Sequence, residues 1–128
     1  MIKIDPIIAV KDVAASSNWY RQVFGFKNVH GNNEAFAVLV SENDEIVICL
    51  HKWGAHEHPT MTNPNITPGN GLILYLRTEN MNEIRQNVDT LGCPIEDDIH
   101  LNPNSTKKEF SLRDPDGYYL TITEFHKY

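Results

Sequence analysis

Two β-forming runs near the C-terminus are joined by four turn residues, and this pattern constrains the fold more than any other part of the chain. The runs cover residues 109–113 and 118–122, and Asp114-Pro115-Asp116-Gly117 lies between them. Proline presets φ for the second position of a turn, and glycine supplies a position where φ can be positive. The segment therefore predicts a β-hairpin.

The chain also contains one supersecondary unit twice. In each half, a β-rich run precedes a helix that Asp12 or Asn80 can cap, and Gly25 or Gly92 stops the helix. Glu83 lies three residues after Asn80, as in a capping box. The predicted strands are residues 2–10, 26–30, 34–40, 45–51, 72–77, 93–99, 107–113 and 118–126. The order βαβββ thus occurs twice, which is a signal at the level of the fold.

Length and composition suit one packed domain with an acidic surface. The chain has 128 residues, 41% of them hydrophobic, and a net charge of −6. Its longest basic cluster is Lys107-Lys108, so we expect no nucleic-acid partner. We find no apolar run of membrane-spanning length and no leader pattern, and we expect a cytoplasmic protein with no membrane partner. Cys49 and Cys93 lie in apolar runs typical of buried thiols.

The hairpin and the repeat resemble those of the vicinal oxygen chelate superfamily, which includes glyoxalase I, bleomycin-resistance proteins and extradiol dioxygenases. Residues 9–13, with Asn18-Trp19-Tyr20 and Phe24-Gly25-Phe26, are similar to the family's opening pattern. The resemblance implies an α+β fold in which two βαβββ modules form a curved mixed-sheet cup around a ligand, often in a homodimer. It implies a single domain over residues 1–128, with modules at about 1–53 and 70–128 and a connecting loop at about 54–69.

The resemblance also identifies four positions at which metal-dependent members carry His, Glu or Gln. In this chain those positions fall on Asp5, Ile48, Ile73 and Thr121. Isoleucine has no lone pair to donate, and divalent cations need oxygen, nitrogen or sulfur ligands. A shift of one residue brings in Val47 or Cys49, and Leu72 or Leu74, which barely helps. We therefore expect neither a metal nor another cofactor, as in the bleomycin-resistance type.

Strand alternation then predicts which side chains face the ligand. Alternation places Ile7 and Ala9 with Asp5, Ile46 and Leu50 with Ile48, and Glu124 on the helix side. Arg77 suits an anionic group or a salt bridge at the rim, and Trp53 suits stacking on a flat ligand or packing under the loop. The predicted ligand-binding residues are Asp5, Ile48, Trp53, Ile73, Tyr75, Arg77, Tyr119 and Thr121.

Three polar segments allow more than one interpretation. His51, His56, Glu57 and His58 suit either a zinc site or a polar flap over the cavity mouth. His100 suits a general base, or it orders a turn together with Asn102. The sequence leaves open which face carries Glu109, Ser111 and Arg113.

Three functions are compatible with these features. The first is metal-free binding of a small, partly apolar molecule, with sequestration or conversion of that compound. The second is a metal-dependent lyase or dioxygenase of glyoxalase type. The third is a structural or interaction module whose cavity is filled by its own side chains. A shared fold does not choose among them, since common folds support many activities.

Overall fold

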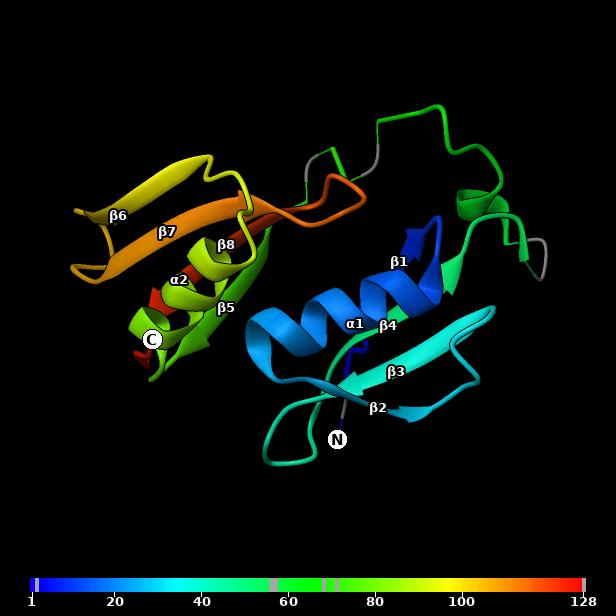
Figure 1. Ribbon diagram of the computed structural model, residues 1–128, viewed down its shortest axis with the longest axis horizontal. Helices are drawn as coiled ribbons and strands as arrows, with labels where there is room; N and C mark the ends of the chain where they lie inside the picture. Colours follow the sequence, from blue (N-terminus) through cyan, green and yellow to red (C-terminus); the bar gives the residue numbers. More distant parts are fainter. Residues whose placement is uncertain (2, 56–57, 68, 71, 128) are drawn as a thin grey trace. The chain divides into compact units, whose positions relative to one another are not determined.

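The computed structural model describes residues 1, 3–55, 58–67, 69–70 and 72–127, and the chain divides into two compact units, residues 1–68 and 69–128 (Figure 1). The first unit contains β1 (Ile7–Val10), α1 (Val13–Phe24), β2 (Lys27–His30), β3 (Phe36–Val40) and β4 (Ile46–Lys52). The second contains β5 (Leu74–Thr78), α2 (Met81–Thr90), β6 (Asp97–Leu101), β7 (Lys108–Arg113) and β8 (Tyr119–Glu124). A short 3₁₀ helix, Pro59–Met61, lies between β4 and β5.

Each unit builds a four-stranded mixed sheet with the same strand order. The orders are β1-β4-β3-β2 in the first sheet and β5-β8-β7-β6 in the second. In each sheet the first strand pairs in parallel with the last, and the other neighbours are antiparallel. The predicted βαβββ repeat and the α+β class are confirmed.

The two helices begin differently. At α1, the Asp12 carboxylate accepts a hydrogen bond from the backbone N–H of Ala15 at 3.0 Å, and Gly25 ends the helix at φ 79°, as predicted. At α2, the Asn80 side chain makes no capping hydrogen bond, so the predicted capping box is wrong at that residue. Its backbone N–H instead donates to the Thr78 hydroxyl at 3.0 Å.

The Asp-Pro-Asp-Gly segment forms the predicted turn between β7 and β8. Asp114 is only 5% exposed, and its Oδ1 accepts backbone hydrogen bonds from Asp116 and Tyr118, both at 2.9 Å. Gly117 has φ 91°, and its N–H donates to the Asp114 carbonyl at 3.0 Å. The turn therefore sets how the two strands are paired.

Several predicted strands were too long or misplaced. β1 begins at Ile7 rather than at residue 2, and β6 begins at Asp97 rather than at residue 93. Pro6 directly precedes β1, and proline cannot donate to a ladder. Pro94 lies three residues before β6. The last strand ends at Glu124 rather than at residue 126.

In the second unit, α2 covers one face of the sheet. Phe110, Leu112, Leu120 and Ile122 are fully buried on that face, and Val88 of α2 is fully buried as well. The guanidinium of Arg85 on α2 lies 5.9 Å from the ring centroid of Phe110, which identifies the covered face. Because side chains alternate along β7 and β8, the residues between these point the other way.

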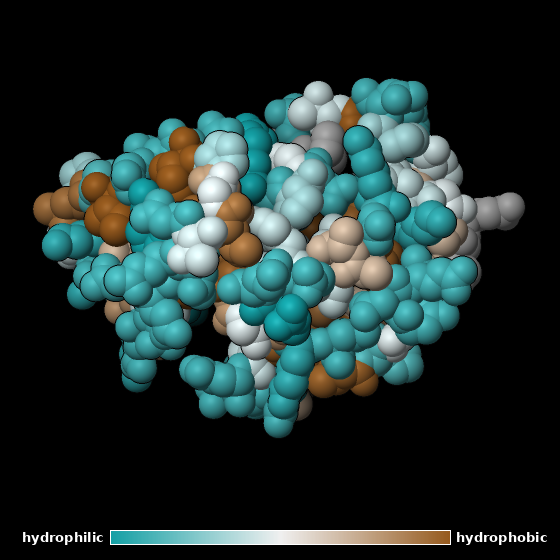
Figure 2. All heavy atoms as spheres, viewed as in Figure 1, coloured by the Kyte–Doolittle hydropathy of each residue, from teal (hydrophilic) through white to brown (hydrophobic). Residues whose placement is uncertain are grey.

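In the first unit, α1 packs on β3 and β4. Ala37, Leu39 and Leu50 are fully buried in the sheet, and Val13 and Val23 of α1 are buried with them. Apolar side chains are thus collected into the layer beneath each helix, while the surface seen in Figure 2 is largely hydrophilic. Neither helix, within the part of the chain that is described, is long and apolar enough to cross a membrane.

Candidate functional site: the open face of the second sheet

Strand register gathers polar side chains on the face of the second sheet that α2 does not cover, which we call the open face. Directly paired residues project from the same face of a sheet. Tyr75 pairs with Thr121, which pairs with Ser111, and Thr123 pairs with both Arg77 and Glu109. The open face therefore carries Tyr75, Arg77, His100, Glu109, Ser111, Arg113, Tyr119, Thr121 and Thr123.

Glu109 lies at the centre of the closest group of polar side chains on this face. It is only 9% exposed. Its Oε1 accepts a hydrogen bond from the Asn102 amide at 3.1 Å, and its Oε2 accepts one from the Tyr75 hydroxyl at 3.4 Å. The Nε2 atom of His100 lies 3.6 Å from Oε1. Three neighbouring segments thus hold one carboxylate in place.

The backbone carbonyl of Asp98 orients His100 towards Glu109. Its Nδ1 lies 2.9 Å from the Asp98 carbonyl, and a carbonyl can only accept, so Nδ1 carries a proton. This hydrogen bond raises the pKa of His100 above its ordinary value, and the charges of Asp97 and Glu109 act in the same direction. A second proton on the ring then falls on Nε2, the nitrogen that faces Glu109.

Beside Glu109, the open face carries buried hydroxyl groups. Ser111 and Thr121 are 4% and 5% exposed, and their hydroxyl oxygens share a hydrogen bond of 2.9 Å. The Thr123 hydroxyl donates to the Lys108 carbonyl at 3.2 Å. Each of these three hydroxyl groups therefore has a hydrogen-bond partner.

The two arginines of the open face are already engaged by the protein. Arg77 donates to the His126 carbonyl at 2.7 Å and lies 5.5 Å from the ring centroid of Phe125. Arg113 donates to Glu96 at 3.1 Å and to the Gly117 carbonyl at 2.7 Å. Arg77 is therefore held by a carbonyl and a ring, a partner set that the sequence did not suggest.

In the first unit, the register separates residues that the sequence had grouped together. Ile7 pairs with Cys49, and Ala9 pairs with His51. Ile48 pairs with Leu39 and directly precedes Cys49 on β4, so its side chain points to the opposite face. Ile48 is 3% exposed and shares its face with the buried Leu39 and Leu50. The prediction that Ile48 and Leu50 share a face with Ile7 and Ala9 is wrong, because it was one residue out of register.

Cys49 takes the position that Ile48 was expected to occupy. Burial raises the pKa of the Cys49 thiol, and the nearby negative charge of Asp5 raises it further. Asp5 precedes β1 and is exposed. Asp5 and Cys49 are therefore close enough to interact, and the raised pKa favours the neutral form of the thiol.

The other predicted residues lie in varied surroundings. Ile73 precedes β5 and is 59% exposed, and Trp53 is half-buried directly after β4. His51 is 3% exposed, its Nδ1 lies 2.8 Å from the Lys52 carbonyl, and its ring lies 4.9 Å from that of His58. His56 and Glu57, the remaining members of the histidine-rich segment, lie outside the described residues.

The side chains at the four metal positions do not fit a divalent cation. Ile48 and Ile73 have no ligating atom, and the Thr121 hydroxyl is bonded to Ser111. Elsewhere among the described residues, no three His, Cys, Asp or Glu side chains converge as a metal would require.

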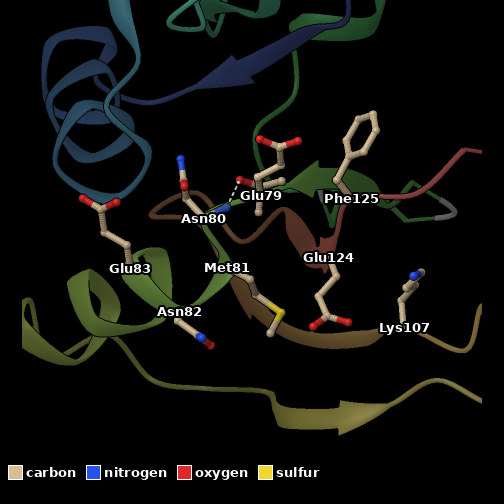
Figure 3. Close-up of a pocket in the computed structure, with 9 residues that line it drawn as sticks. Glu79, Asn80, Met81, Asn82, Glu83, Lys107, Glu124 and Phe125 are labelled. Atoms are coloured by element: carbon tan, nitrogen blue, oxygen red, sulfur yellow. Dashed lines mark hydrogen bonds between the residues drawn. The ribbon is translucent and has the colours of Figure 1, made fainter.

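A separate pocket of about 610 Å³ lies at the N-terminus of α2. Figure 3 shows Glu79, Glu83 and Glu124 around it, with Lys107 at one side. A helix N-terminus favours anions, whereas three carboxylates repel them. The pocket thus lacks a consistent electrostatic preference, and we place the candidate site on the open face instead.

Sequence reasoning missed the central residue of the site. Glu109 and Asn102 were not among the predicted ligand-binding residues, although the turn contained the signal. Because Asp114 pairs with Tyr118 across the turn, counting back three residues on one strand and forward three on the other brings Ser111 opposite Thr121. Counting five residues in each direction brings Glu109 opposite Thr123.

The fold and the strand pattern define a class of two-module α+β proteins, and comparison with known proteins identifies it. The model of the Glyoxalase/Bleomycin resistance protein/Dioxygenase superfamily matches residues 3–122, so the chain belongs to this superfamily. The resemblance drawn from the sequence is confirmed. A search of curated proteins gave no match.

Solved structures share the fold at low sequence identity. Lactoylglutathione lyase from Agrobacterium tumefaciens is 19% identical with a TM-score of 0.71, over 96% of this chain and 92% of that one. A bleomycin resistance determinant encoded on the transposon Tn5 is 17% identical with a TM-score of 0.71, over 99% and 100%. A bleomycin-binding protein complexed with bleomycin is 17% identical with a TM-score of 0.69, over 98% and 100%.

Proposed function

We propose that this protein binds a small, partly apolar molecule on the open face of its second sheet, without a metal ion. The observation that carries the proposal is the set of nearly buried polar side chains on that face, Glu109, Ser111, Thr121 and Thr123. A sheet face that served only as packing surface would carry apolar side chains, as the face under α2 does. A few convergent polar groups beside apolar walls are typical of ligand sites.

The residues predicted for the ligand fit this proposal to different degrees. Tyr75, Tyr119 and Thr121 lie on the open face, and the exposed ring of Tyr75 suits stacking. Arg77 shapes the same face through its bond to the His126 carbonyl. The contributions of Asp5, Ile48, Trp53 and Ile73 rest on the family resemblance. For Ile48, a supporting role beneath α1 fits its burial better.

Proteins with this fold support a binding role but do not identify the ligand. One structure with this fold is that of a bleomycin-binding protein in complex with bleomycin. We extend the binding of a small molecule, but not its identity, to the present chain. We further propose that the protein is a cytoplasmic homodimer and that it sequesters or converts the compound.

The metal content of the protein tests this proposal. Untagged protein is purified without chelator, dialysed and analysed for divalent metals. We expect well below one equivalent per chain, because Ile48 and Ile73 occupy two of the four family positions. Stoichiometric metal would overturn the metal-free proposal in favour of a lyase or dioxygenase of glyoxalase type.

A second measurement separates ligand binding from a purely structural module. Native mass spectrometry and amide chemical shifts would follow binding of small flat molecules to the wild type, to Thr121→Val and to the control Asn82→Ala. We expect Thr121→Val to weaken binding and the control Asn82→Ala to leave it unchanged. If no small molecule moves the amide resonances of β5, β7 or β8, the open face has no ligand role.

A further inference from the structure

Both hydrogen bonds to the Glu109 carboxylate come from uncharged groups. The Asn102 amide and the Tyr75 hydroxyl are neutral donors. Among the residues that the structure describes, His100 is the basic group within ion-pair distance of this carboxylate, at 3.6 Å. An ionised carboxylate that is nearly buried is costly unless a positive group pairs with it. Glu109 therefore favours a cationic partner.

The Glu109 carboxylate can accept further hydrogen bonds from such a cation. A carboxylate offers about four lone-pair positions, and Asn102 and Tyr75 occupy one each. The exposed Tyr75 ring lies at the same carboxylate and can cover the flat body of a ligand. An anionic ligand would be repelled by Glu109, and the nearby Arg77 and Arg113 already have protein partners.

We propose that Glu109 binds a cationic group of the ligand, namely a protonated amine, amidine or guanidine attached to a flat or apolar body, and that His100 competes with this cation. The inference rests on the proposed function and gives its ligand a chemical class. The cation forms a charge-assisted hydrogen bond with Glu109, stronger than the bonds from Asn102 and Tyr75.

The groups that face Glu109 and His100 explain why His100 competes with a ligand cation. Tyr75 on β5, His100 on β6 and Thr123 on β8 face Glu109, with Asn102 from the turn. His100 faces Asp97, Glu109 and the Asp98 carbonyl. A protonated His100 places an N–H towards Glu109 and neutralises it, so ligand cations should bind more tightly as the pH rises and His100 becomes neutral.

Three probes of one shape separate charge from size. Benzamidinium, benzamide and benzoate are titrated into the wild type, Glu109→Gln and Glu83→Gln, and binding is followed by calorimetry and by amide shifts. Glu83→Gln removes the same charge from the exposed surface of α2. We expect benzamidinium to bind the wild type at least about tenfold more tightly than benzamide, as one charge-assisted hydrogen bond allows. Glu109→Gln should abolish this preference and Glu83→Gln should keep it.

Each outcome decides between the two proposals. Equal binding of benzamide or benzoate by the wild type overturns the cation site but leaves small-molecule binding intact. Absence of benzamidinium binding at millimolar concentration also overturns the cation site. Stoichiometric metal, in contrast, overturns the proposed function itself. A preference for benzamidinium that survives in Glu109→Gln assigns recognition to another residue.

A pH series does not depend on the folding of the Glu109 variant. Benzamidinium stays protonated between about pH 6 and about pH 8, whereas His100, whose pKa the bond to the Asp98 carbonyl raises, loses its proton as the pH increases. The wild type should bind benzamidinium more tightly at about pH 8 than at about pH 6. In His100→Gln the affinity should be the same at both pH values. A wild-type affinity that does not change with pH overturns the competition.

Discussion

Replacement of Ile48 by alanine tests which face of the first sheet this residue occupies. Ile48 is 3% exposed and lies with Leu39 and Leu50 beneath α1. The change removes about three buried carbons, worth about 2.4 kcal/mol at about 0.8 kcal/mol each. The cavity left behind adds to this loss, so the expected decrease in the free energy of unfolding is about 3–4 kcal/mol.

Ile46→Ala is the matched control, because it removes the same atoms from the same strand. Ile46 is 46% exposed, so we expect a loss of no more than about 1.5 kcal/mol. Urea denaturation followed by far-UV circular dichroism measures both variants. In thermal unfolding, Ile48→Ala should lower the Tm by roughly 10–15 °C for a domain of this size. Equal losses in the two variants would refute the placement of Ile48 in the buried layer.

Two further predictions concern the second unit. Asp114→Ala removes the acceptor of the N–H groups of Asp116 and Tyr118, so it should lower the free energy of unfolding by about 2–4 kcal/mol. Asp114→Asn keeps an oxygen acceptor and should lower it clearly less. Similar losses in urea denaturation would contradict this account of the turn. The bond to the Asp98 carbonyl is the main cause of the raised pKa of His100. A raised pKa stabilises the folded protein below the ordinary histidine pKa, and this contribution is lost as the pH rises through the pKa of the folded state. The stability difference between wild type and His100→Gln should therefore shrink between about pH 6 and about pH 8, and a constant difference would rule the account out.

Local features of the sequence were sufficient for most of the fold. The caps at Asp12 and Gly25 depend on nearest neighbours along the chain, and so does the turn around Asp114 and Gly117. The repeat of the βαβββ order also identified the superfamily. Where the start of β1 was misjudged, Pro6 directly precedes the strand, and the missing N–H of proline fits that boundary.

The site was predicted only in part. Tyr75, Tyr119 and Thr121 were placed on a common face, and the register agrees with that grouping. Glu109 was missed because its face could not be assigned from β7 alone. The partner strand settles the face, since Glu109 lies opposite Thr123.

The sequence by itself determined the order of the elements, their caps and turns, and the absence of ligating atoms at Ile48 and Ile73. For Ile48 and Glu109, the tertiary structure decided which face of the sheet the side chain occupies. A strand alternates every residue, so a register error of one residue moves a side chain from the layer under a helix to the opposite face. Ile48 and Cys49 differ in this way, and strand pairing likewise brings Glu109, Tyr75 and His100 together from three separate strands.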